Sequence, residues 1–114
     1  MQQLSILIVE DDPMVLFINQ RYLSKMAMTT DIQEATTVQE ALTQLENRHF
    51  DLILLDVELK NGNGLDLAKK IRKKKIPIEI IMVTASNHRK HVAEMLQIGI
   101  LDYILKPFDY SRLE

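Results

Sequence analysis

The stretch Phe50–Gly64 reads Phe-Asp-Leu-Ile-Leu-Leu-Asp-Val-Glu-Leu-Lys-Asn-Gly-Asn-Gly, and the rest of the sequence can be interpreted outward from it. Residues 52–55 form an unbroken apolar run that is too short for a helix. Such a run, with no polar alternation, predicts a strand covered on both faces, as in a parallel sheet. The run ends at Asp56, before a loop rich in glycine and asparagine. We therefore expect Asp56 at the carboxyl end of a central strand, where open α/β sheets place their ligand chemistry.

Apolar runs and cap signals predict an alternation of strands and helices on both sides of this stretch. Strands are expected at Leu4–Val9, Thr30–Ala35, Ile78–Val83 and Leu101–Leu105, the second of them half polar and suited to a sheet edge. Helices are expected from Pro13 to about Met26, from Val38 behind the capping-box pattern Thr37-Val38-Gln39-Glu40, over Gly64–Lys75, over Asn87–Ile98, and beginning in Phe108–Glu114. This order predicts an α/β domain with a doubly wound parallel sheet and helices on both faces.

The bulk composition describes one globular domain and excludes several classes of protein. The chain has 114 residues, 46% hydrophobic and 26% charged, so it can bury a single core. Its net charge of −2 offers no electrostatic case for nucleic-acid binding by this domain. It has no cysteine, no basic leader before the first apolar run, and no run of membrane-spanning length. We expect a soluble, cytoplasmic protein without a membrane partner.

Polar side chains follow four of the predicted strands. Asp11 and Asp12 follow the first strand, Asp56 the central one, Thr84 the fourth and Lys106 the fifth. The carboxyl ends of parallel strands meet at one edge of the sheet, so these side chains are expected to share a pocket. Clustered carboxylates repel one another unless a cation is present, and oxygen ligands suit Mg²⁺. An Asp carboxylate can attack phosphorus, and a hydroxyl and an ammonium can meet the charge of a phosphoryl group.

Each of these residues also has a purely structural interpretation. A strand-end Asp is most often a helix cap or a loop residue, and the acidic pair before Pro13 is often just a cap. Thr84 alone carries little information, and a single Lys106 is most often solvated. Their joint appearance at four strand ends of one small α/β pattern favours a shared site.

The ordered set Glu10-Asp11-Asp12, Asp56, Thr84-Ala85 and Lys106-Pro107 resembles the receiver domain of bacterial two-component response regulators, over nearly the whole chain. The resemblance implies a flavodoxin-like receiver fold with strand order 2-1-3-4-5. It also implies that Asp56 accepts a phosphoryl group from a sensor histidine kinase. The chain would then be a conformational switch that assists its own phosphorylation and dephosphorylation, and not a turnover enzyme.

The same resemblance implies a metal-binding role for the acids. Mg²⁺ would be bound directly by Asp12, by Asp56 and by the backbone carbonyl of Glu58. Asp11 would act through a water molecule.

It further implies how the switch responds to the phosphoryl group. Thr84 and Lys106 would contact that group, and Tyr103 would be the aromatic residue that turns inward when Thr84 moves. The Lys106-Pro107 peptide would be cis. The output surface would be the helix Asn87–Ile98, the strand Leu101–Leu105 and the helix that follows, through which the domain would form a homodimer.

Within this family, the stretches Ile8–Leu23, Leu54–Arg72 and Ile81–Ala85 are similar to regulators of citrate, malate and other C4-dicarboxylate uptake. Those regulators carry a DNA-binding helix-turn-helix domain after the receiver, so we expect DNA contact through a further domain. Two positions depart from the family pattern. Leu59-Lys60 stands where Met-Pro is frequent, and Phe108–Glu114 is too short for a complete fifth helix, which suggests a truncated receiver.

Two other function classes fit parts of the pattern. A haloacid-dehalogenase-type phosphohydrolase also uses an Asp nucleophile, Mg²⁺, a Thr or Ser, and a Lys. It would place an Asp where Glu58 stands, and its motifs would occur in the reverse order. A flavodoxin-like cofactor binder would share the sheet, but it needs a Ser/Thr/Gly-rich phosphate loop where this chain has acids.

Two remaining features have a functional and a structural interpretation. Lys69–Lys75 holds six basic residues in seven, which can be a docking patch for an acidic partner or a solvated helix end that complements the helix dipole. His88 and His91 are spaced to share a helix face and could bind a metal, but without an evident third ligand exposed surface is the simpler interpretation.

Overall fold

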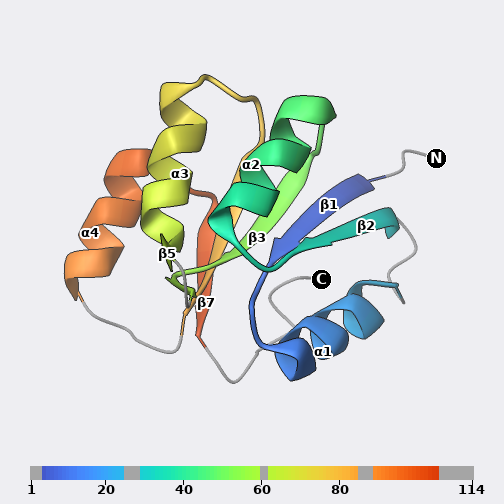
Figure 1. Cartoon of the computed structure of the whole chain (residues 1–114). Coiled ribbons are helices and arrows are strands. Elements are labelled where there is room, and N and C mark those ends of the chain that lie inside the picture. The colour runs from blue at the N-terminus through green and yellow to red at the C-terminus, as the bar shows by residue number, and fades with distance from the viewer. Residues whose placement is uncertain (1–3, 25–28, 60–61, 85–88, 106–114) are drawn as a thin grey trace.

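The computed structural model describes residues 4–24, 29–59, 62–84 and 89–105, without the side chains of 22–24, 29–30, 84, 89–92 and 102–105. Five parallel strands form one sheet in the order β2-β1-β3-β6-β7, with helices on both sides (Figure 1). The strands are β1 (Leu4–Val9), β2 (Thr29–Ala35), β3 (Leu52–Asp56), β6 (Glu79–Thr84) and β7 (Asp102–Leu105). The helices are α1 (Pro13–Ser24), α2 (Val38–Asn47), α3 (Gly64–Lys73) and α4 (Arg89–Ile98). The predicted fold class and strand order are confirmed.

Both faces of the sheet are apolar and buried, as the unbroken strand runs predict. Helices α2, α3 and α4 cover one face and α1 covers the other (Figure 1). Successive residues of β1 alternate between the faces. Leu7 and Val9 join the large core beneath α2, α3 and α4, whereas Ile6 and Ile8 join a smaller cluster with Leu16 of α1.

The predicted start of α2 is confirmed, with one change in its capping. Thr37 is the N-cap, and its hydroxyl accepts a hydrogen bond from the Glu40 N–H at 3.1 Å. The Glu40 carboxylate reaches back to the hydroxyl and the N–H of Thr36, one residue before the cap. These hydrogen bonds, first the one from the Thr36 hydroxyl, lower the pKa of Glu40.

Two local features differ from the sequence prediction. A short antiparallel hairpin, β4 (Glu58–Leu59) with β5 (Gly62–Asn63), occupies part of the stretch that we expected to be a loop. Helix α3 ends at Lys73, two residues early, because Lys75 adopts a left-handed conformation with φ of 57°. The expected extension of α1 to Met26 and the segment Phe108–Glu114 lie outside the described residues. None of the described helices has both the length and the apolar character needed to cross a bilayer.

Charged side chains tie the elements together at the amino-terminal edge of the sheet. Asp51 accepts a hydrogen bond from the Ser5 N–H at 2.9 Å, and this bond lowers the pKa of the Asp51 carboxyl. Arg72 of α3 donates to two backbone carbonyls, Ile78 at 2.9 Å and Gly99 at 3.0 Å. Arg72 therefore links α3 to the start of β6 and to the end of α4.

At the opposite edge, Gly64 brings the start of α3 against the end of β3. Its N–H donates to the Val57 carbonyl at 2.9 Å, and Asn63 caps the helix by accepting from the Leu65 N–H at 2.7 Å. A Cβ at position 64 would lie 2.0 Å from the Asp56 carbonyl oxygen. Only glycine allows this approach, so Gly64 fixes the backbone that carries Asp56.

We predict that Gly64→Ala lowers the free energy of unfolding by at least about 2 kcal/mol, because the new methyl group collides with backbone atoms that cannot turn aside. Urea denaturation followed by circular dichroism measures this loss. Gly62→Ala is the control, since its Cβ would meet the Val38 Cγ2 methyl at 2.9 Å and that side chain can move. We expect the control to cost less than about 1 kcal/mol. Equal losses in the two variants would contradict this account of Gly64.

We also predict that Lys75→Gly raises the free energy of unfolding by about 1 kcal/mol, because a left-handed residue with a Cβ is strained and glycine is not. Lys74→Gly is the matched control, since Lys74 is right-handed with φ of −81° and gains nothing from glycine. The same denaturation experiment compares them. A Lys75→Gly variant no more stable than Lys74→Gly would contradict the strain.

Candidate functional site

The register of the two central strands places an acid from each at the same level. Ile8 pairs with Leu54 and Val9 with Leu55, so Glu10 and Asp56 are the next residues in the ladder. The Glu10 N–H donates to the Ala35 carbonyl at 3.0 Å, which continues the strand pattern past Val9. Both acids then face the α1 side of the sheet, by the same alternation that turns Ile8 and Leu54 there. Each of the two residues is only 2% exposed.

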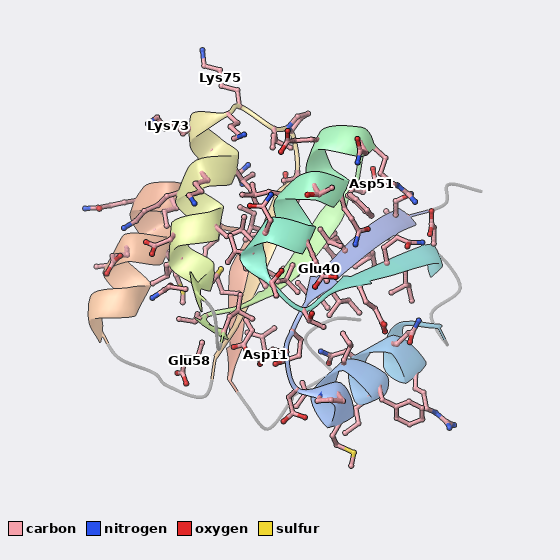
Figure 2. All side chains as sticks on the ribbon, in the orientation of Figure 1. Asp11, Glu40, Asp51, Glu58, Lys73 and Lys75 are labelled. Atoms are coloured by element: carbon pink, nitrogen blue, oxygen red, sulfur yellow. The ribbon has the colours of Figure 1, made fainter. Side chains whose placement is uncertain are left out.

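Three carboxylates meet at this level. Ligand oxygens of Glu10, Asp11 and Asp56 all lie within 4.8 Å of one another. Figure 2 shows Asp11 at the same end of the molecule as Glu58. Carboxylates this close repel one another when ionised, and a bound cation relieves that repulsion. Compact oxygen donors suit a hard divalent cation such as Mg²⁺. The donor set therefore fits the metal that the sequence predicted.

Asp12, which the sequence predicted as a direct metal ligand, is not part of this cluster. Its carboxylate is exposed, and Oδ1 accepts a hydrogen bond from the Met14 N–H at 2.9 Å. Its carbonyl accepts from the Leu16 N–H at 2.9 Å. Asp12 is thus the cap of α1, and its predicted capping role is confirmed.

Glu10, which the sequence analysis placed in the ordered acidic set without a metal-binding role, belongs to this cluster. It follows the last apolar residue of β1 just as Asp56 follows the last apolar residue of β3, and this equivalence was the available signal. Its Oε2 also accepts a hydrogen bond from the Asp12 N–H at 3.2 Å. Glu10 therefore shapes the turn as well as facing Asp56.

The main chain after β3 holds Asp56 in place. The Glu58 N–H donates to Asp56 Oδ1 at 3.1 Å, and the Val57 N–H donates to the Val83 carbonyl of β6 at 3.0 Å. Glu58 lies on β4 with its side chain exposed. The Asp56 carboxylate is therefore oriented by a backbone donor two residues away.

The other predicted site residues come from β6 and beyond. Thr84 is the last residue of β6 and pairs with Leu105 of β7, at the same edge of the sheet as Asp56. Tyr103 is the second residue of β7. The side chains of Thr84, Tyr103 and His91, and the whole of His88 and Lys106, lie outside the described residues. The roles predicted for them, and the cis peptide at Lys106-Pro107, stay predictions.

Comparison with known proteins agrees with this geometry. The response regulator receiver domain family matches residues 6–114. The protein named Probable C4-dicarboxylate response regulator DctR, of Halalkalibacterium halodurans, is 37% identical over 109 residues, which are 96% of this chain and 47% of the relative. The transcriptional regulatory protein MalR of Bacillus subtilis is 37% identical over 97% of this chain and 47% of its own length. The chain thus spans about half the length of these curated relatives.

Solved structures give the same result. A response regulator receiver domain protein of Methanospirillum hungatei superimposes with a TM-score of 0.88 at 30% identity, over 98% of this chain and 88% of that one. The MaeR response regulator, solved bound to beryllium trifluoride, is 40% identical with a TM-score of 0.74, over 97% of this chain and 91% of that one. This chain belongs to the response regulator receiver domain family.

Proposed function

We propose that this receiver accepts a phosphoryl group on Asp56 from a sensor histidine kinase and thereby changes the activity of an output, transcription. The observation that carries the proposal is the cluster of Glu10 and Asp11 around a buried Asp56 at the carboxyl end of the central strand. Receivers act with a histidine kinase as partner, and the relatives include transcriptional regulators. A phosphoryl group adds nearly two negative charges, enough to favour one of two arrangements.

We propose Glu10, Asp11 and Asp56, with the backbone carbonyl of Glu58, as the residues that hold Mg²⁺. The cluster supports Glu10 in the place that the sequence assigned to Asp12. The ion, when bound, supplies positive charge against the phosphoryl oxygens. It also offsets the mutual repulsion of the three carboxylates.

Asp56 is the nucleophile in this proposal. A carboxylate oxygen of Asp56 forms the new bond to phosphorus, and the phosphorus–nitrogen bond of the phosphohistidine breaks. The histidine nitrogen keeps the electron pair and takes a proton from solvent. The hydrogen bond from the Glu58 N–H orients the nucleophile, and we assign Thr84 and Lys106 to the phosphoryl oxygens.

The phosphohydrolase alternative has no support among the relatives. Such an enzyme needs a general acid two residues after its nucleophile. Glu58 stands there, and its side chain is exposed. The curated relatives DctR, MalR and LytR are named as regulators.

We propose that the output passes through the face formed by α4 and β7, which pairs with a second copy when Asp56 is phosphorylated. Leu96 of α4 is 76% exposed, and Leu101, just before β7, is 61% exposed. Exposed apolar side chains that gather on one face can mark a protein–protein interaction site. We further propose that a DNA-binding domain follows Glu114 in the complete protein, in line with the transcriptional relatives; the downstream coding sequence tests this directly.

For the site, we predict that acetyl phosphate with Mg²⁺ adds one phosphoryl mass to the chain, and that Asp56→Asn abolishes the addition. Asp11→Asn should raise the Mg²⁺ concentration for half-maximal phosphorylation at least about tenfold, which corresponds to about 1.4 kcal/mol of lost binding. Asp12→Asn should change that concentration less than about twofold, since Asn caps a helix as well as Asp does. Intact mass spectrometry measures all three.

Two results would contradict the site. A phosphoryl adduct that persists in Asp56→Asn would exclude Asp56 as the acceptor. A larger Mg²⁺ effect from Asp12→Asn than from Asp11→Asn would exclude the proposed ligand set and restore the assignment made from the sequence.

For the output face, we predict that acetyl phosphate converts the wild-type chain to a dimer and that Leu96→Glu keeps it monomeric with unchanged phosphorylation. The introduced charge would have to be buried at the interface. Phe17→Glu is the control, because Phe17 is 55% exposed on α1, across the sheet. Sedimentation velocity distinguishes the species. A dimer blocked by Phe17→Glu and not by Leu96→Glu would place the interface on α1.

A further inference from the structure

The carboxyl end of α3 carries a cluster of exposed ammonium groups, which we call the lysine tip: Lys70, Lys73, Lys74 and Lys75. Two other cations of the same run are engaged. Lys69 pairs with Glu94 at 3.1 Å, and Arg72 donates to carbonyls. The four lysines of the tip are exposed and form no ion pair with any described residue. The tip is therefore a patch of positive charge whose side chains form no ion pair with a described acid.

The helix dipole explains some of this charge, but not the residue at its end. A cation in the last turn of a helix is stabilised by the exposed carbonyls. Lys75 lies beyond that turn, in the left-handed conformation where glycine is the favoured residue. Lys75 therefore keeps a backbone conformation that is unfavourable for a residue with a Cβ. This indicates that the Lys75 side chain has a function.

The tip lies far from the phosphoacceptor site. Figure 2 shows Lys73 and Lys75 at one end of the molecule and Asp11 and Glu58 at the other. Acids also lie near the basic end, where Asp51 and Glu79 line one cavity together with Arg72. In the field of a polyanion a local patch of exposed cations is still attracted, and this attraction falls steeply with ionic strength. Contact at the tip leaves Asp56 accessible to a kinase.

The chemistry of the tip suits phosphate groups. Lysine acts as a hydrated point charge and is a common ligand of phosphate, as arginine also is. Lysine is also depleted at protein–protein interfaces. Among the described residues, the large exposed apolar side chains that would enter a membrane lie on α1, on α4 and before β7, and none of them is on α3.

We propose that the lysine tip is a sequence-independent binding site for the phosphate backbone of duplex DNA. It adds an electrostatic contact to a regulator whose relatives act in transcription, independently of phosphorylation at Asp56. Four neutralised phosphates correspond to a slope of about −3.6 in log affinity against log salt. The total charge of the chain does not reveal this site, because the 16 acidic residues of the chain outnumber its 14 basic residues.

Fluorescence anisotropy of a short labelled duplex of random sequence, titrated with this chain at a series of low salt concentrations, tests the proposal. Wild-type protein should bind with that steep salt dependence. Lys73→Gln combined with Lys74→Gln should weaken binding at least about fivefold and reduce the slope by about two. Lys73→Arg with Lys74→Arg should restore it. Lys75→Gly should weaken DNA binding while stabilising the fold.

The matched control combines Gln20→Glu with Gln39→Glu, which changes the net charge by the same two units on exposed positions of α1 and α2. It should bind DNA within about twofold of wild type. Vesicles of phosphatidylserine and a polyglutamate chain serve as competing anions. Absence of duplex binding at low salt, equal weakening by the control, or binding to vesicles or polyglutamate alone would each overturn the proposal.

Discussion

The repulsion between buried carboxylates on neighbouring parallel strands is the constraint on which this domain depends. The register of β1 against β3 determines that Glu10 and Asp56 lie at the same level. Because Ile8 pairs with Leu54, the residues two positions further on, Glu10 and Asp56, are neighbours. Burial makes the repulsion stronger than it would be in water. Backbone donors offset part of it, the Glu58 N–H at Asp56 and the Asp12 N–H at Glu10. A cation bound at the proposed site would offset it further.

Carboxylates that repel one another stay close only if the backbone that carries them is held in place. The packing around the site provides this restraint. The strand that carries Asp56 is buried on both faces, by the large core and by the smaller cluster under α1. Gly64 allows α3 to begin directly against the Asp56 backbone. The backbone that carries Asp56 is therefore held on both sides by packing.

The sequence predicts the parts of this structure that local rules determine. Unbroken apolar runs identified the buried strands, and the Thr37 cap and the glycine at position 64 located the starts of two helices. The choice among three consecutive acids was beyond such rules. Whether an acid faces the pocket or caps the helix depends on where the alternation of β1 ends, and the ladder continues one residue past Val9. The left-handed end of α3 was equally hidden, because a lysine stands where glycine is the usual signal.

The two hydrogen bonds of Arg72 have a mechanical consequence for α4. They fasten the carboxyl end of that helix, at Gly99, to α3 and to the start of β6. A helix held at one end can rotate about that end more easily than it can translate. A displacement that begins beside Thr84 would therefore rotate α4 about Gly99. The amino-terminal end of α4 would then move farthest.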